Sequence, residues 1–282
     1  MKLLKVSTAI AGIISLPSAV FAGDMASPLS VPSIMDPPPL VDSGGGASDS
    51  SGVSGSLSFD YNSHFISYGA DVWGAGKDLD DALFNPSIEL TFQITDDVSF
   101  SLGTWWDVND NAVSSIGGES IQEVDVWAGL HFGIGAVSVS LVYQEWLYAQ
   151  ESERIIDVIL GLDAPFSPSL TFHNRVAEGA SGGDTGTVAV LGFEHGFSLG
   201  SVDFSIPLNV AAATDGYHGG DSGFAYASIG LSASVPLTFV NDDLGSWNLH
   251  GGLTAFFTSD DVIPNNADEN FVTANVGIGV DF

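Results

Sequence analysis

The chain has 282 residues and a formal net charge of −30, because 35 Asp and Glu residues stand against only 5 Lys and Arg residues. So acidic a surface would repel nucleic acid phosphates, and we expect no nucleic acid partner. The absence of cysteine excludes disulfides and thiolate metal sites. Charged residues make up only 14%, aromatic residues make up 11% and there are 34 Gly, which is typical of many strands joined by Gly-rich turns.

The first 22 residues predict a secretory signal peptide. Lys2 and Lys5 form a basic start, the following residues 6–16 are mostly apolar, and small residues allow cleavage after Ala22. An uncleaved anchor is the weaker alternative, because this apolar run is too short to span a bilayer. Beyond Ala22 no apolar run reaches the roughly 18 residues of a spanning helix, so any residence in a membrane must be as a barrel.

Residues 23–52 are rich in Pro at first and in Ser and Gly from Ser43 to Gly52. Pro-rich chain is extended and Gly/Ser-rich chain is flexible, so we expect a flexible periplasmic segment here. The remaining residues, 53–282, are expected to form one outer-membrane β-barrel.

From residue 53 onward, apolar and polar residues alternate with a period of two, as in strands with one apolar and one polar face. In one segment, Ile88 and Leu90 alternate with Glu89 and Thr91. An even number of such strands is usual for single-chain outer-membrane barrels. The pattern predicts about twelve strands, at 53–68, 86–95, 97–108, 121–134, 136–148, 153–163, 168–177, 186–198, 201–213, 223–239, 245–258 and 270–282.

The connections between these segments alternate between short and long. Outer-membrane barrels have short periplasmic turns and longer extracellular loops. The short connections are 96–97, 135, 164–168, 199–200 and 240–244. The longer ones are 69–85, 109–120, 178–185, 214–222 and 259–269, while 150–152 is a short exception among them. The fold class predicted is therefore all-β, an antiparallel transmembrane β-barrel in the outer membrane of a Gram-negative bacterium, with both termini periplasmic.

Two prolines and the terminal aromatic residue refine this prediction. Pro207 and Pro236 fall inside predicted strands, where a missing N–H breaks the ladder, so each should mark a bulge or a strand end. The final segment is amphipathic and ends in the aromatic residue Phe282, which resembles the signal read by the outer-membrane assembly machinery.

In such a barrel the apolar rows face lipid and the polar rows face the interior. The pore-lining candidates on the polar rows are Asp60, Asn62, His64, Glu89, Gln93, Glu123, Asp125, Asp157, Arg175 and Asp203. Aromatic residues near strand ends suggest interfacial girdles, namely Trp73, Trp106, Trp146, Tyr148, Tyr226 and Trp247. Trp105 and Trp127 fall on the inward row, where packing inside the barrel is expected.

Several short motifs occur within residues 58–162, among them Asp60-Tyr61, Gly103-Thr104-Trp105 and Glu123-Val124-Asp125. The first resembles the opening segment of the TorF-type porin family, and the other two resemble its later motifs. Asn85-Pro86-Ser87 also resembles a family motif, whereas Tyr68-Gly69 replaces an Arg-Gly pair. The resemblance implies a porin without catalytic residues.

Motifs for chemistry do not occur. The sequence contains neither Gly-x-Ser-x-Gly nor His-Glu-x-x-His, and its 6 histidines are scattered, so we expect no enzyme. The segment 107–111 begins like a calcium loop but lacks its later Gly and Glu, so we expect no metal site and no cofactor. Loose binding of divalent cations by acidic loops is left open.

These patterns favour a passive channel for small hydrophilic solutes that prefers cations, since inward carboxylates outnumber Arg175. A high-salt habitat is a competing explanation of the acidity. The alternatives are a structural or surface-interaction barrel with a closed lumen, and a soluble secreted β-sandwich. The expected partners are outer-membrane lipid and lipopolysaccharide, the outer-membrane assembly machinery, and small solutes or cations.

Overall fold

The computed structural model describes residues 52–73, 82–111, 116, 120–179, 181 and 183–282. The predicted signal peptide (1–22) and nearly all of the flexible segment (23–52) therefore lie outside the described residues. Within the described part of the chain, no helix is both long enough and apolar enough to cross a membrane.

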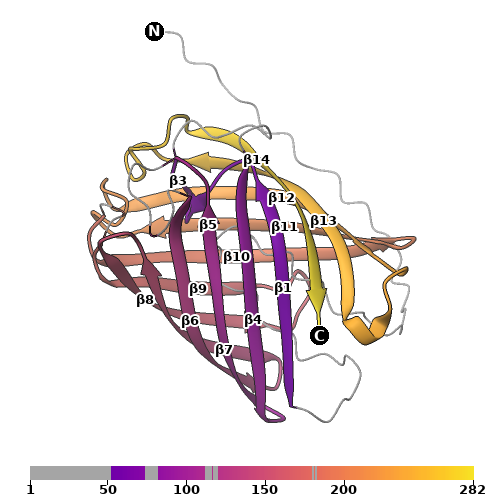
Figure 1. Cartoon of the computed structure of the whole chain (residues 1–282). Helices are drawn as coiled ribbons and strands as arrows, with labels where there is room; N and C mark the ends of the chain where they lie inside the picture. Colours follow the sequence, from indigo (N-terminus) through magenta and orange to yellow (C-terminus); the bar gives the residue numbers. More distant parts are fainter. Residues whose placement is uncertain (1–51, 74–81, 112–115, 117–119, 180, 182) are drawn as a thin grey trace, which may run out of the picture.

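The chain forms a closed antiparallel barrel of 12 strands, as the alternating pattern predicts (Figure 1). β1 pairs with β14 on one side and with β4 on the other, so the barrel has no free edge along its circumference. The strands are β1 (Val53–Asn62), β4 (Leu83–Thr95), β5 (Val98–Val108), β6 (Ile121–Ile134), β7 (Val137–Leu147), β8 (Ser152–Leu162), β9 (Ser169–Ala177), β10 (Gly186–Leu199), β11 (Val202–Ala213), β12 (Gly223–Pro236), β13 (Ser246–Thr258) and β14 (Asn270–Asp281).

The prediction that the first strand continues to residue 68 is wrong. β1 ends at Asn62, and the chain then forms a separate hairpin of β2 (Ile66–Ser67) and β3 (Ala70–Asp71). Its two turn residues, Tyr68 and Gly69, have φ of 48° and 89°. Two consecutive positive φ values are the mark of a tight type I′ hairpin turn, which reverses the chain where the sequence pattern continues as a strand.

The two prolines behave differently. Pro236 is the last residue of β12, as expected. Pro207 lies within β11 and produces no register shift, so the bulge expected there is absent: Ser205 pairs with Ser232, and Leu208 with Ile229, in one register. Gly230 lies opposite the proline ring, and a Cβ on Gly230 would come within 2.9 Å of Pro207 Cγ.

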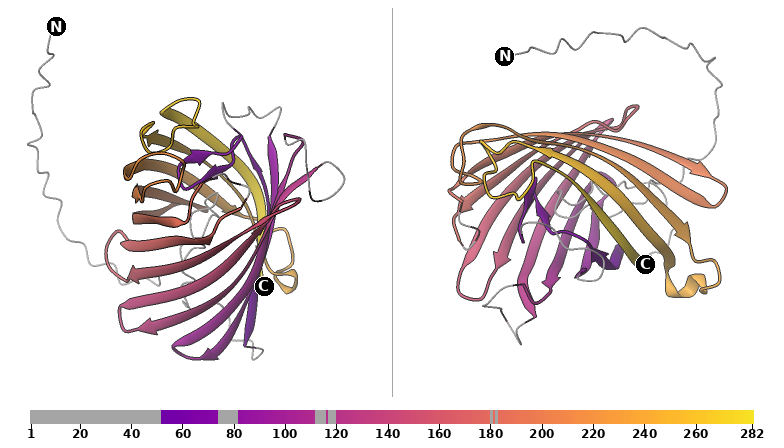
Figure 2. Two further views of the ribbon diagram at one scale, coloured as in Figure 1. Left: turned by 90° about the vertical axis from the view of Figure 1, so that its left-hand side faces the viewer. Right: turned by 90° about the horizontal axis from the view of Figure 1, so that it is seen from above.

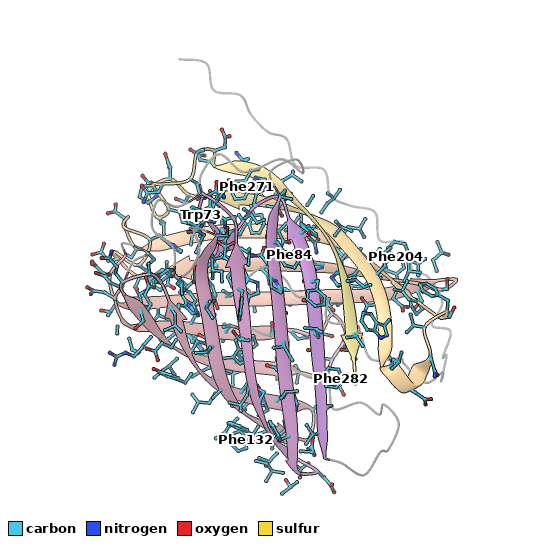
Figure 3. All side chains as sticks on the ribbon, viewed as in Figure 1. Trp73, Phe84, Phe132, Phe204, Phe271 and Phe282 are labelled. Atoms are coloured by element: carbon cyan, nitrogen blue, oxygen red, sulfur yellow. The ribbon has the colours of Figure 1, made fainter. Side chains whose placement is uncertain are left out.

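The two ends of the barrel differ. Connections 63–82, 109–120, 178–185, 214–222 and 259–269 lie at one end, which we call the long-loop end. The opposite, short-turn end carries 96–97, 135–136, 163–168 and 200–201, and also 237–245 with its short 3-10 helix, η2 (Asp242–Leu244). This last connection is longer than predicted because β12 already ends at Pro236. In Figure 3, Trp73 and Phe271 lie toward the long-loop end, and Phe132 and Phe282 toward the other.

The outer surface of the barrel is apolar around its whole circumference. Exposed outward residues include Phe59, Ile88, Leu102, Val126, Leu141, Phe172, Leu191, Leu208, Ile229, Leu253 and Val276. Polar residues alternate with these and point inward, as the period-two pattern predicts.

Candidate functional site

The interior of the barrel is the candidate site, and its inward side chains differ in exposure from one end to the other. Toward the short-turn end Gln93 is exposed, and Glu89 and Asp203 are partly exposed. Deeper toward the long-loop end, six of the predicted pore-lining residues are at most 5% exposed. These six are Asp60, Asn62, Glu123, Asp125, Asp157 and Arg175. Their polar atoms are packed against other side chains rather than against an open lumen.

The side chain of Glu89 on β4 points toward the interior of the barrel. Trp127 Nε1 on β6 donates a hydrogen bond to Glu89 Oε2 at 2.6 Å, passing over β5. Gly103 of β5 makes this crossing possible, because a Cβ there would lie 2.1 Å from the Trp127 ring. Trp127 therefore packs inside the barrel, as its place on the inward row predicts.

Asp60 on β1 is bound to β13 across β14. His250 Nε2 lies 2.6 Å from Asp60 Oδ1, and Ser58 Oγ donates to the other carboxylate oxygen at 2.6 Å. Asn248 Oδ1 is 2.8 Å from the second ring nitrogen of His250. A Cβ at Gly277 of β14 would meet Asp60 Oδ1 at 2.1 Å, so glycine leaves the space for this pair.

Asp157 on β8 belongs to a fully buried group. His173 Nδ1 on β9 lies 2.7 Å from Asp157 Oδ1, and both side chains are 0% exposed. The His173 ring stacks on Tyr68 of the β2–β3 turn with ring centroids 3.7 Å apart, and on Trp146 of β7 at 5.4 Å. The pair thus connects the wall to the infolded hairpin.

Arg175 on β9 holds a second loop inside the barrel. Its Nε lies 2.8 Å from Glu153 Oε2, and its NH1 donates to the carbonyl of Tyr217 at 2.8 Å. Its guanidinium also lies 4.1 Å above the Tyr217 ring centre. The positive charge of Arg175 is attracted to the electron-rich face of the Tyr217 ring. The Arg175–Glu153 pair is buried, so losing either partner would leave the other charge unpaired and without water.

Further acidic residues lie close to this group. Glu123 and Asp125 are neighbours on the inward face of β6, and Tyr148 donates to Glu123 at 3.1 Å. Asp107 on β5 accepts from Trp73 at 3.0 Å and from Asn85 at 3.1 Å. Among the residues that the structure describes, no three His, Asp or Glu side chains are arranged to hold a metal ion.

Residues of three long connections fill the barrel at the long-loop end. A buried apolar cluster joins Tyr68 of the first connection, Tyr217 of the β11–β12 connection, and Val262 and Ile263 of the β13–β14 connection. Inward residues of the wall complete the cluster, namely Trp146, Ile155, Val188, Val190, Ala211, Ala213, Ala225 and Tyr226. Figure 2 shows the indigo β2–β3 hairpin within the ring of strands at this end.

This packing corrects the predicted aromatic girdles. Trp146 and Tyr226 are 2% and 1% exposed and lie in the interior cluster, and Trp73 binds Asp107. Trp106 is exposed on the outer surface at 39%. The alternating pattern places an aromatic on a face, but it does not reveal that infolded loops provide an apolar environment inside.

The pKa values of loop residues follow from burial. Burial lowers the pKa of His218 to about 3, and the nearby Arg175 and His173 add to this effect. Burial also raises the pKa of Tyr217, which Arg175 partly opposes. His64, predicted as pore-lining, lies after β1 beside Ser63 Oγ at 2.7 Å, and burial lowers its pKa against the opposing effect of Asp71.

Sequence reasoning missed Asp107, Glu153, Tyr68 and Tyr217. The first two lie on the inward rows of β5 and β8, so strict use of the alternating pattern would have included them. The two tyrosines lie in turns, and the sequence pattern carries no signal that these connections fold inward.

Comparison with known proteins gives a fold likeness only. No protein-family model matches the chain, and no curated protein matches it, so membership of the TorF-type family is not confirmed. Similar solved structures include the COG4313 outer membrane channel from Pseudomonas putida F1, with 12% identity, a TM-score of 0.48 and coverage of 82% of this chain and 95% of that one. The NanC porin has 8% identity, a TM-score of 0.42 and coverage of 80% and 98%, and Salmonella typhi OmpF has 10% identity, a TM-score of 0.39 and coverage of 82% and 97%. At these identities and TM-scores, we take no functional assignment from them.

Proposed function

We propose that this chain is a porin-like outer-membrane barrel that conducts small hydrophilic solutes and prefers cations. A closed barrel satisfies its backbone hydrogen bonds internally, and the apolar outer surface suits acyl chains. Its partners would be outer-membrane lipid and lipopolysaccharide, the assembly machinery that reads the Phe282 strand, and permeating ions. Residence in a Gram-negative outer membrane is part of the proposal.

The observation that carries the cation preference is the charge of the inner wall. Among the described strand residues that point inward, carboxylates far outnumber cations: Asp60, Glu89, Asp107, Glu123, Asp125, Glu153, Asp157 and Asp203 face inward with Arg175. Glu89 and Asp203 are the partly exposed members of this set. Their charges act on an ion in the lumen within the screening length of about 8 Å at physiological ionic strength.

The proposal includes no catalytic step. His131 lies between Ser101 and Ser140, with ring nitrogens 2.9 and 2.8 Å from the two hydroxyls. Both serines are at most 2% exposed, so a substrate could not approach either hydroxyl oxygen. We therefore assign the Ser101–His131–Ser140 group a structural role.

Planar-bilayer recording in a salt gradient tests the proposal. The wild-type barrel should show a reversal potential whose sign indicates cation selectivity. The double variant Glu89→Gln/Asp203→Asn should move this potential toward zero. These two carboxylates are partly exposed, unlike the fully paired Asp157. Asp110→Asn, in an exposed loop, is the matched control and should move it little. An anion-type reversal potential would refute the cation preference.

A closed structural or surface-interaction barrel is the second candidate. The burial of inward residues on the strands at the long-loop end favours it. It predicts that the barrel binds detergent and shifts on a gel when boiled, yet shows no conductance under any voltage or pH.

A further inference from the structure

The first long connection closes the long-loop end of the barrel through its β2–β3 hairpin. Phe65 packs on Trp105 of β5 with ring centroids 5.1 Å apart, and Tyr68 stacks on His173 of β9 at 3.7 Å. Gly69 lies against Tyr226 of β12, where an added Cβ would come within 2.5 Å of the ring. The hairpin therefore touches widely separated parts of the inner wall and crosses the lumen.

The hairpin is not part of the barrel sheet. β2 and β3 pair only with each other, through two residue pairs, and so short a hairpin is not stable by itself. The turn holds Tyr68 in the left-handed region at φ 48°, which a bulky residue adopts only when its surroundings impose it. Packing against the wall, rather than local backbone preference, keeps the hairpin in the lumen.

One polar clamp fixes the hairpin to the opposite loop. Asn266 of the β13–β14 connection accepts from the backbone N–H of Asp71 at 2.8 Å and donates to the carbonyl of Gly69 at 2.9 Å. The β11–β12 loop is held more firmly, because Arg175, which is paired with Glu153, binds both the carbonyl and the ring of Tyr217. The hairpin, in contrast, forms no strand pairing with the barrel sheet, and the Arg175–Glu153 ion pair does not hold it.

We infer that the β2–β3 hairpin, residues 66–71, is a displaceable plug whose departure opens the lumen at the long-loop end. The inference rests on the proposed channel function. When the hairpin leaves, the side chains it covers, His173 with its partner Asp157, become accessible from the long-loop end. The barrel itself stays closed, since the twelve-stranded sheet does not use the hairpin.

A tether tests the inference in the full barrel. The chain has no cysteine, so Asp71→Cys with Asn266→Cys introduces one defined disulfide between the hairpin and the facing loop. Under oxidising conditions, channel openings in planar bilayers should fall at least about tenfold, which equals about 1.4 kcal/mol, and a reductant should restore them. The two single-cysteine variants are controls and should not respond to the redox change.

A second variant works in the opposite direction. Tyr68→Ala removes the stacked ring and should raise the open probability, whereas Tyr143→Ala, on the outer surface of β7, should not. A shift in gel mobility on boiling checks that each barrel is folded. If the wild-type barrel conducts and neither the tether nor Tyr68→Ala changes its opening, the plug is wrong while the channel stands. If folded wild-type, Tyr68→Ala and reduced tether variants all fail to conduct, both are wrong.

Discussion

Acidification should loosen the plugged end of the barrel through His218. This ring is half-buried in the β11–β12 connection and faces Arg175 and His173 of β9, the Tyr217 ring at 4.8 Å and the backbone of Tyr68. Its pKa in the folded state is about 3, below the ordinary value of 6.5. A proton therefore binds His218 more tightly when the loop 214–222 is released into water than when it is packed inside the barrel.

The sign and size follow from linkage. Above about pH 6.5, His218 is neutral in both the packed and the released loop, and its titration does not change the stability of the packed loop. Between about pH 6.5 and pH 3 only the released loop binds the proton, so the packed loop becomes less stable as the pH falls. With about 1.36 kcal/mol per pKa unit, the loss at pH 5 is about 2 kcal/mol, or about thirtyfold in the released population.

Hydrogen exchange of the backbone amides in residues 214–222 measures this release. Protection should fall between pH 7 and pH 5 after correction for the intrinsic pH dependence of exchange. His218→Gln should remove most of the change, and His195→Gln, exposed at the short-turn end, should leave it intact. Equal pH dependence in wild type and His218→Gln would refute the reasoning.

Three further predictions concern the barrel itself. Gly277→Ala should destabilise it by about 1–3 kcal/mol, because the new methyl group overlaps Asp60, while Gly133→Ala has space; the temperature of the gel-mobility shift measures this. Deleting Phe282 should lower outer-membrane yield without affecting export, since its backbone makes two hydrogen bonds with Gly55, at 2.7 and 2.9 Å, and unchanged yield after fractionation would contradict this. Boiled and unboiled wild-type samples should migrate differently on a denaturing gel, and equal migration with extraction into carbonate would contradict a membrane barrel.

The strands were predictable from sequence because an apolar outer surface and a polar interior impose strict alternation on every strand. The first strand was overextended for the same reason: Phe65, Ile66 and Tyr68 are apolar enough to continue the pattern, although they pack inside the lumen. A period of two assigns a residue to a face but does not say whether that face meets lipid, water or an infolded loop.

The candidate site was predictable only in part. Alternation identified the inward carboxylates Asp60, Glu123 and Asp157, and burial by loops from elsewhere in the chain decides which of them reach water. The partners of these groups, such as His250 and His173, depend on strand register, which the sequence of one strand does not specify.

The clamp on the hairpin also has a consequence for the order of assembly. Asn266 binds residues that lie 195 and 197 positions earlier in the chain, and the backbone of Ala274 binds Ser63 across 211 positions. Contacts between such distant segments form slowly, since the loop between them must close first. These contacts therefore complete the closure of the barrel, because they can form only once the last strands lie beside β1.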